Sequence, residues 1–301
     1  MRAVSSAASQ VDADFEIIVV NDGSTDGSAE LVKNASVPRL SLIEQANGGV
    51  SAARNRGIAA AEGKWIAFLD ADDFWSDDHL AGLSKAVESS DVIAAFSNVR
   101  LQSRAGGPSL APKVPAQKIN DYFSFALSNG GYPVSSSSMM ALRDQLLAAG
   151  CFAEGVRAGE DIDMWCRLAC RGPFAYTAGL SSTYNDEGSP TRCAGGKAVF
   201  PFFAQRFPEL VSDGKLPARL VESGRRYVNF LILEYARQLI DSGRHSEARA
   251  VLLKDCVPGY DIRRFLKRLA RTSSLGSTLY RLFQNRVRTP DAGELTGKHT
   301  S

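Results

Sequence analysis

The chain has 301 residues, of which 44% are hydrophobic and 23% are charged, an ordinary composition for a folded protein with a full core. Lysine and arginine total 35 against 33 aspartate and glutamate residues, so the near-neutral balance gives no electrostatic case for a nucleic-acid partner. No apolar run approaches the ~20 residues of a membrane-spanning helix, and the N-terminus lacks a signal-peptide pattern. We therefore expect a cytoplasmic protein, or one that lies peripherally on the inner face of a membrane.

The first sixty residues alternate apolar strands with polar loops and helices. The β-branched run at 15–20 predicts a buried parallel strand, and Asp22 follows its end. Ligands of α/β units bind beyond the carboxyl ends of strands, so Asp22 is placed to accept hydrogen bonds from a base or ribose. The alternative is a plain Asx turn. A second strand at 40–43 leads through the glycine-containing loop 47–51 into a helix.

That helix is predicted over residues 52–61 and carries Arg54 in its first turn. A guanidinium fork there is placed to grip a base or a phosphate, and glycines such as Gly48 let the backbone approach a ligand closely. Arg54 is equally explained as a solvated surface charge. Repeated strand and helix units of this kind indicate an α/β domain with a mainly parallel sheet.

The next predicted strand, 66–69, ends in a cluster of acids: Asp70, Asp72 and Asp73. In an extended chain residues two apart point the same way, so Asp70 and Asp72 can present both carboxylates to one spot. Mg²⁺ or Mn²⁺ usually takes one or two carboxylates together with phosphate oxygens and water, so the expected ligand is a diphosphate with its metal. The alternative is an acidic turn ahead of the next helix.

Further along, loose glycine- and proline-containing sequence between 98 and 133 predicts an inserted loop region, because loops on a rigid scaffold commonly carry specificity. We assign no catalytic role to the serine run 135–138, which precedes a predicted strand at 139–142. Glu160 and Asp161 begin a helix with apolar positions on one face, which would hold Asp161 rigidly at a pocket. The alternative is an acidic first turn that stabilises the helix dipole.

Four segments, taken together, resemble the signatures of the family 2 glycosyltransferases, which are inverting, metal-dependent enzymes of the GT-A fold. The segments are 22–26, 47–55, 68–73 and 159–168. The resemblance covers about residues 1–192. It implies a GT-A catalytic domain over 1–193 with a Rossmann-like α/β fold and a mainly parallel central sheet.

On the donor side, the resemblance implies that Asp22 and Arg54 contact the base, with Gly48 among the nucleotide-sugar-binding residues. It places Asp70 at the ribose or diphosphate, with Ala71 beside it in the same motif. These residues would bind a nucleotide-sugar donor, for which a UDP-sugar is favoured.

For the chemistry, the resemblance implies that Asp72 holds Mg²⁺ or Mn²⁺ and that Asp161 is the catalytic base. Glu160 would shape the acceptor end of the pocket, and Trp165 would lie on the acceptor side. Relatives often carry a histidine near 184–189; here it is absent. Glu187 is the expected replacement as a metal or phosphate-side group, the alternative being a simple turn.

A second departure lies at the N-terminus. Family members usually begin with a central strand and a Pro-x-Tyr-Asn-like loop, whereas here Met1 falls inside the helix that follows them. We expect either a true start upstream or a fragment with a damaged sheet, and we favour the upstream start because a central gap would expose unpaired edges.

From about residue 194 the pattern becomes helical, and we predict a helical region over 194–288 and a disordered tail over 289–301. Arginines interleaved with leucine and phenylalanine over 263–288 predict a basic amphipathic surface, which would hold the protein against anionic lipid. The alternative is a helical cap with its arginines in water.

The expected function is transfer of a sugar, with inversion, to a glycan or lipid-linked acceptor in cell-surface polysaccharide or glycolipid synthesis. A non-catalytic nucleotide-sugar-binding relative is the first alternative, and the retained Glu160 and Asp161 argue against it. A metal-dependent nucleotidyltransferase is the second, and no glycine-rich triphosphate loop supports it.

Overall fold

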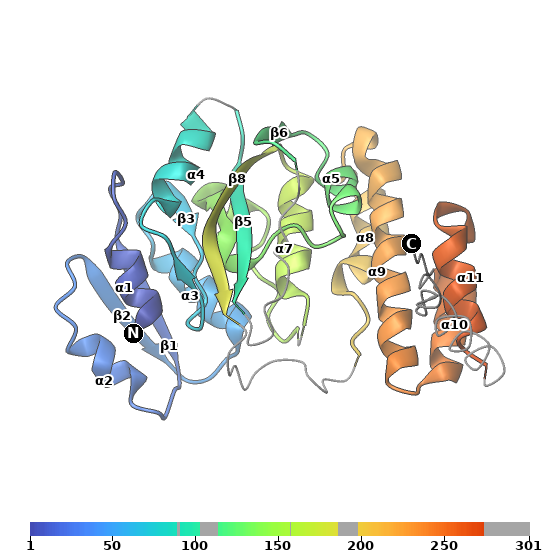
Figure 1. Cartoon of the computed structure of the whole chain (residues 1–301), viewed down its shortest axis with the longest axis horizontal. Helices are drawn as coiled ribbons and strands as arrows, with labels where there is room; N and C mark the ends of the chain where they lie inside the picture. The colour runs from blue at the N-terminus through green and yellow to red at the C-terminus, as the bar shows by residue number, and fades with distance from the viewer. Residues whose placement is uncertain (89–90, 103–113, 157, 186–197, 274–301) are drawn as a thin grey trace, which may run out of the picture. The chain divides into compact units, whose positions relative to one another are not determined.

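The computed structural model describes residues 1–88, 91–102, 114–156, 158–185 and 198–273. The chain divides into two compact units, Met1–Val228 and Asn229–Ser301, with the division inside helix α9 (Val221–Asp241) (Figure 1). The predicted domain boundary at 193 and the predicted tail over 289–301 lie outside the described residues, so both stay predictions.

The first unit is an α/β structure, as the sequence predicted. In chain order it contains α1 (Arg2–Ala8), β1 (Ile17–Asp22), α2 (Ser28–Lys33), β2 (Leu40–Gln45), α3 (Val50–Ala60), β3 (Trp65–Ala67), β4 (Phe74–Trp75), α4 (His79–Glu88), β5 (Ala94–Gln102), β6 (Gln117–Ile119), α5 (Tyr122–Ser128), the 3₁₀ helix η1 (Ser136–Ser138), β7 (Met139–Leu142), α6 (Arg143–Ala148), α7 (Glu160–Ala169), β8 (Phe174–Asn185), α8 (Phe202–Ser212) and the 3₁₀ helix η2 (Ala218–Leu220).

The described strands form two sheets. In the smaller one β1 lies parallel to β2, with Ile17 opposite Leu40. The larger sheet has the order β3-β7-β5-β8-β4, with β6 also paired to β8. Each of β1 and β3 has a single partner among the described strands.

The strand directions differ in part from the mainly parallel sheet that the sequence predicted. Among the described strand pairs, β1 with β2 and β5 with β8 are parallel, and the other described pairs are antiparallel. The reason is visible at β7. It begins directly after η1, beside the end of β3, because the amide of Phe68 bonds the carbonyl of Met139. β7 therefore runs back antiparallel to both of its neighbours.

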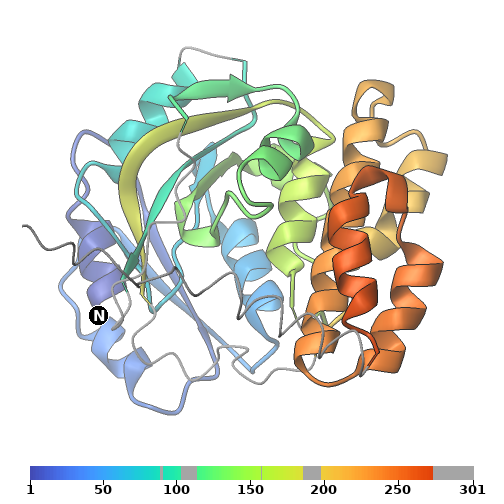
Figure 2. The ribbon, with the colours of Figure 1, turned by 45° about the vertical axis from the view of Figure 1, so that its right-hand side comes forward.

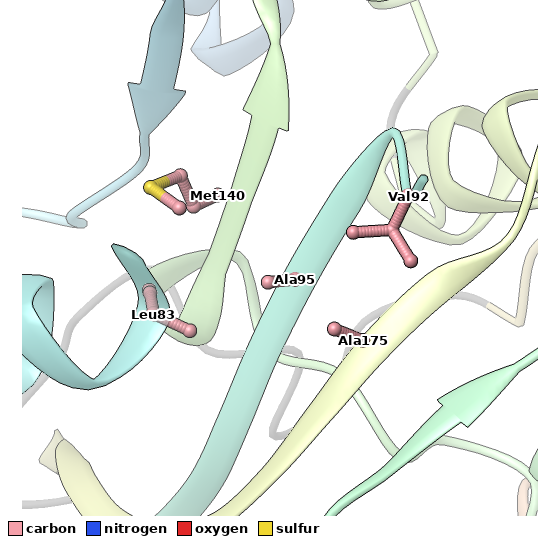
Figure 3. Close-up of a cluster of buried hydrophobic side chains, with 5 residues drawn as sticks. All are labelled: Leu83, Val92, Ala95, Met140 and Ala175. Carbon is pink, nitrogen blue, oxygen red and sulfur yellow. The ribbon is translucent and has the colours of Figure 1, made fainter. Parts of the chain in front are cut away.

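Both faces of the larger sheet are covered. On one face, side chains of β5, β7 and β8 meet Leu83 of α4 in the cluster drawn in Figure 3: Leu83, Val92, Ala95, Met140 and Ala175. Successive residues of a strand point to opposite faces, so Phe96 lies on the other side, where its ring contacts those of Phe125 in α5 and Tyr176 in β8. Figure 2 shows the long, curved β8 with α5 and α7 beside it. This core holds the loops at the ends of the strands.

The second unit is helical, as predicted for the C-terminal region. After the end of α9 it contains α10 (His245–Asp255), the 3₁₀ helix η3 (Pro258–Tyr260) and α11 (Ile262–Ala270). Its core consists of Leu233, Ala236, Leu252 and Phe265. Buried Arg268 of α11 pairs with Glu234 of α9 at 2.5 Å. Within the described residues, no helix is long and apolar enough to cross a membrane.

Candidate functional site

Asp22 is held by the loop that follows β2. Its carboxylate accepts hydrogen bonds from the amides of Gly48 and Gly49 and from Nε2 of Gln45, each at 2.8 Å. Burial acts to raise the pKa of Asp22, but these hydrogen bonds hold the pKa below its usual value. A Cβ on Gly48 would lie 2.9 Å from the Cβ of Ala52, so the loop needs glycine there. The anionic Asp22 therefore fixes the approach to α3; its predicted contact with a base stays a prediction.

The acid cluster forms a turn after β3, because the amide of Asp73 donates to the carbonyl of Asp70. The prediction that Asp70 and Asp72 point the same way in an extended chain is therefore wrong: the chain turns here, and the turn separates the acids. Asp70 is about one-third exposed and pairs with Arg54, Asp72 is exposed next to Ala71, and Asp73 is 1% exposed. Burial, reinforced by the charges of Asp70 and Asp72, raises the pKa of Asp73 to about 6.

Arg54 joins this turn to the start of α7. Its Nη2 lies 2.8 Å from Oδ1 of Asp70, and its Nη1 lies 3.0 Å from Oε1 of Glu160. The guanidinium also lies 5.2 Å from the centre of the Phe152 ring. With a side chain 12% exposed, Arg54 is an internal bridge between two predicted site acids rather than the solvated charge that the sequence left open. Contact with a base remains a prediction.

Asp161 lies in the first turn of α7, which begins after Gly159 at a φ of 78°. Its Oδ1 accepts a hydrogen bond from the amide of Ile162 at 2.7 Å. Burial is the main cause that raises the pKa of Asp161 to about 6; the charge of Glu160 adds to this, and the charge of Arg54 opposes it. A carboxylate with a pKa near neutrality can accept a proton at physiological pH, which is what a general base must do.

Beneath the acids, three aromatic rings pack together. The ring centres of Phe68 and Phe152 lie 5.5 Å apart, and each lies 5.6 Å from the ring centre of Trp165 in α7. Phe68 precedes Asp70 by two positions, and Trp165 follows Asp161 by four. The cluster therefore fixes the strand end and the helix relative to each other. Trp165 is 1% exposed, so the structure places it in the core below the site; its predicted role on the acceptor side stays untested.

The sequence analysis did not single out Asn55, which holds the loop before α7. Its side-chain amide donates to the carbonyl of Phe152 at 2.9 Å, and its carbonyl accepts from the amide of Phe152 at 2.8 Å. Asn55 follows Arg54 directly and belongs to segment 47–55, which resembles a family signature. Its place in that segment is the sequence feature that could have marked it as a site residue. The sequence pattern also did not reveal Ser137, whose buried hydroxyl donates to Asp73 of the acid turn at 2.6 Å.

A metal site complete in itself is absent from the described residues, where no three His, Cys, Asp or Glu side chains converge. The carboxylate of Asp72 has neither a hydrogen bond nor an ion pair with any described residue, and it is exposed at the turn. That arrangement fits an ion that brings phosphate oxygens with it. Glu187, the predicted second metal ligand, lies outside the described residues.

Comparison with solved structures defines the fold class. TarS of S. aureus, crystallised as residues 1–349 with UDP-GlcNAc, superposes with a TM-score of 0.62 at 18% identity, over 91% of this chain and 78% of that one. The mannosyltransferase PcManGT of Pyrobaculum calidifontis, solved with GDP-Man and Mn²⁺, gives a TM-score of 0.55 at 19% identity, over 94% and 79% of the two chains. The fold is the GT-A fold of nucleotide-sugar glycosyltransferases.

The sequence itself gives the family. Residues 1–149 match the model of Glycosyl transferase family 2, and the chain belongs to that family. The succinoglycan biosynthesis protein ExoO of Rhizobium meliloti is 34% identical over 206 residues, which cover 64% of this chain and 58% of that protein. The chain spans less than two thirds of the length of this relative and of other curated glycosyltransferases that it matches. The predicted family is confirmed.

The bridge formed by Arg54 leads to a prediction about stability. Arg54→Met keeps the apolar stem but leaves Asp70 and Glu160 without their cation, and we expect the free energy of unfolding to fall by about 2–3 kcal/mol. Arg56→Met is the matched control, because Arg56 is exposed on the same helix; its effect should stay within about 0.5 kcal/mol. Urea denaturation measures both, and equal effects would show that the bridge is not a stabilising interaction.

Proposed function

We propose that this protein transfers a sugar from a nucleotide diphosphate sugar to an acceptor hydroxyl, with inversion at the anomeric carbon. The observation that carries the proposal is the position of Asp161 at the start of α7, next to Glu160, whose carboxylate shares Arg54 with Asp70 of the acid turn. A candidate base and a candidate diphosphate-binding turn are thereby joined in one ion-pair network. The family membership agrees with this reaction class.

In the proposed reaction, Asp161 accepts the proton of the acceptor hydroxyl while the hydroxyl oxygen attacks the anomeric carbon. The bond from that carbon to the nucleotide diphosphate breaks at the same time, and attack from the opposite face inverts the configuration. Burial of Asp161 raises its pKa to about 6, which makes it a stronger base than an ordinary aspartate while leaving it mostly ionised at neutral pH. Arg54 and Glu160 orient the start of the helix that carries it.

For the donor side, we propose that Asp72 holds a Mg²⁺ or Mn²⁺ ion together with the donor diphosphate. Such an ion neutralises charge on the leaving diphosphate when bound. Two observations support this assignment: Asp72 is exposed, and its carboxylate has no cation partner among the described residues. Arg2 donates at 3.4 Å to the backbone carbonyl of Asp72, not to the carboxylate. The ligands bound to the two structural neighbours, UDP-GlcNAc and GDP-Man with Mn²⁺, support a nucleotide-sugar donor, and we favour a UDP-sugar. The acceptor is proposed to be a glycan or a lipid-linked glycan, which the relative ExoO, a succinoglycan biosynthesis protein, supports.

Asp161→Asn tests the base. We expect transfer to fall by about 10²–10⁴-fold, because the amide cannot take the proton, while nucleotide-sugar affinity changes little. In the unaltered protein, the rate should fall as the pH drops below about 6, since the base is then protonated. Radiolabelled sugar transfer and equilibrium binding measure the two effects. A variant that loses binding as strongly as turnover would assign Asp161 a structural role, and binding without turnover in the unaltered protein would favour a non-catalytic relative.

The stability of Asp161→Asn at different pH values shows whether this variant is folded and whether the pKa of Asp161 is raised. The folded-state pKa of Asp161, about 6, lies above the ordinary 3.8, so the folded state holds a proton between these pH values that the unfolded chain has lost. Its contribution to stability is therefore present at low pH and lost as the pH rises through about 6. Asparagine carries no charge, so Asp161→Asn should be more stable than the unaltered protein at pH 7.5, by about 2 kcal/mol, and should gain nothing at pH 4.

Asp72→Ala tests the metal. In thermal-shift experiments with UDP, GDP, dTDP and CDP, each with and without MnCl₂, we expect one nucleotide to stabilise the protein in a Mn²⁺-dependent manner; at a hundredfold excess over Kd this amounts to about 3 kcal/mol. Asp72→Ala should abolish the Mn²⁺-dependent part. Asp144→Ala, an exposed acid on α6, should keep it. Retention of the Mn²⁺-dependent part in Asp72→Ala would remove Asp72 from the metal site.

We also propose that α11 holds the protein peripherally against an anionic membrane on the cytoplasmic side. Of the predicted basic surface over 263–288, residues 274–288 lie outside the described residues. In the described part, Phe265 and Arg268 are buried in the second unit, so they are not available to a membrane. The exposed face carries Ile262 and Leu266, which are 49% and 55% exposed, beside exposed basic residues. Apolar and basic side chains on one helix suit the interface of anionic lipids.

Leu266→Glu tests this contact. Replacing an inserted leucine by an acid should lower the fraction that sediments with phosphatidylserine-containing vesicles by about tenfold. Leu31→Glu is the control, because Leu31 is 59% exposed on α2 of the first unit. Sedimentation that is absent in the unaltered protein, or unchanged in Leu266→Glu, would leave α11 as a helical cap in water.

A further inference from the structure

The serine run 135–138 lies next to the acid turn, although no sequence pattern connects the two. Ser136, Ser137 and Ser138 form η1 and are buried, with Ser137 and Ser138 fully inaccessible to solvent. η1 leads directly into β7, which pairs with β3. The fold therefore brings this run alongside the end of the strand that carries the acids.

The hydroxyl of Ser137 contacts both ends of the acid turn. It accepts a hydrogen bond from the amide of Asp70 at 3.0 Å and donates one to Oδ2 of Asp73 at 2.6 Å. The carbonyl of Ser137 accepts from Nε1 of Trp75 at 2.6 Å and from the hydroxyl of Ser182 at 2.9 Å. Because Ser137 is itself anchored to β4 and β8, its hydroxyl is a fixed point against which the turn is held.

Asp73 passes this constraint to the rest of the site. Its second oxygen, Oδ1, accepts a hydrogen bond from the amide of Asn185 at the end of β8 at 3.0 Å. With both oxygens bound in the interior, Asp73 cannot turn outward, and its neighbour Asp72 is left on the exposed side of the turn. A carboxylate that must meet a diphosphate and its ion has to be held in one direction before the ligand arrives.

The geometry points to Ser137 as a positioning residue: its hydroxyl holds the turn Asp70–Asp73 so that Asp72 faces the donor diphosphate and its divalent ion. This inference rests on the proposed function, because it takes Asp72 as the metal ligand. Ser137 touches neither the donor nor the ion; it acts through the amide of Asp70 and the carboxylate of Asp73.

Two serines of η1, Ser137 and Ser138, provide a matched test. Ser138 is as deeply buried as Ser137, but within the described residues its hydroxyl bonds only the amide and the carbonyl of Ser135. We therefore expect Ser137→Ala and Ser138→Ala to lower the melting temperature similarly, while only Ser137→Ala weakens nucleotide binding. Titration calorimetry with MnCl₂ and the nucleotide that stabilises the unaltered protein measures this effect. The expected rise in Kd for Ser137→Ala is about tenfold, because the variant loses one hydrogen bond to a charged group.

The metal dependence separates positioning from general loss of structure. Ser137→Ala should raise the Kd measured with MnCl₂ and leave the Kd measured in EDTA within about twofold, because the turn orients Asp72 toward the ion. Equal effects of the two serine variants, or equal effects with and without Mn²⁺, would overturn the inference. If the unaltered protein binds none of UDP, GDP, dTDP and CDP, the proposed function fails and the inference fails with it. If the unaltered protein binds one of these nucleotides and Ser137→Ala binds it with the same affinity, only the inference fails.

A second variant decides the case in which Ser137→Ala does not fold. Asp73→Asn keeps the shape of the side chain but removes the charge that Ser137 and Asn185 hold. On the inference, it should show the same selective rise in the Mn²⁺-dependent Kd, although Asp73 is 1% exposed and does not face the ligand. An unchanged Mn²⁺-dependent Kd in Asp73→Asn would overturn the inference.

Discussion

The ion-pair bridge of Arg54 is the constraint on which the rest of this site depends. A guanidinium that is only 12% exposed needs carboxylates around it, and Asp70 and Glu160 supply one to each of its terminal nitrogens. One belongs to the turn after β3 and the other to the first turn of α7. The bridge thus joins the segment proposed to bind the donor diphosphate to the segment proposed to remove the acceptor proton.

Arg54 is in turn positioned by contacts at the start and in the middle of α3. At its start, the Asp22 carboxylate binds the amides of Gly48 and Gly49 and so fixes the loop that enters the helix. One position after Arg54, Asn55 clamps the backbone of Phe152, whose ring packs against Phe68. The acids are therefore attached to rigid elements, although they lie in a turn and at a helix start, where backbone freedom is otherwise greatest.

The acids of this site illustrate how one residue type takes several roles. Asp22 is kept ionised by backbone amides, while burial raises the pKa of both Asp73 and Asp161 to about 6. Similar pKa values do not imply similar roles: both oxygens of Asp73 are bound inside the fold, whereas the hydrogen bond of the Asp161 carboxylate within the described part of the chain comes from the amide of Ile162 to Oδ1. Asp161 accordingly keeps its second oxygen unbonded by described residues, as the proposed base requires, and Asp73 serves the turn.

The sequence by itself determined the alternation of strands and helices, the helical C-terminal region and the family, because these follow from local periodicity and from short segments such as 47–55 and 68–73. It also predicted Asp22, Arg54, Asp70, Asp72 and Asp161 as site residues without fixing their surroundings. Only the tertiary structure decided that the acids of the turn face three environments, that Arg54 pairs with Glu160, and that Ser137 holds Asp73. These partners lie 106 and 64 positions apart, respectively, and side-chain contacts between such distant residues are set by how the sheet and helices pack, which no local pattern records.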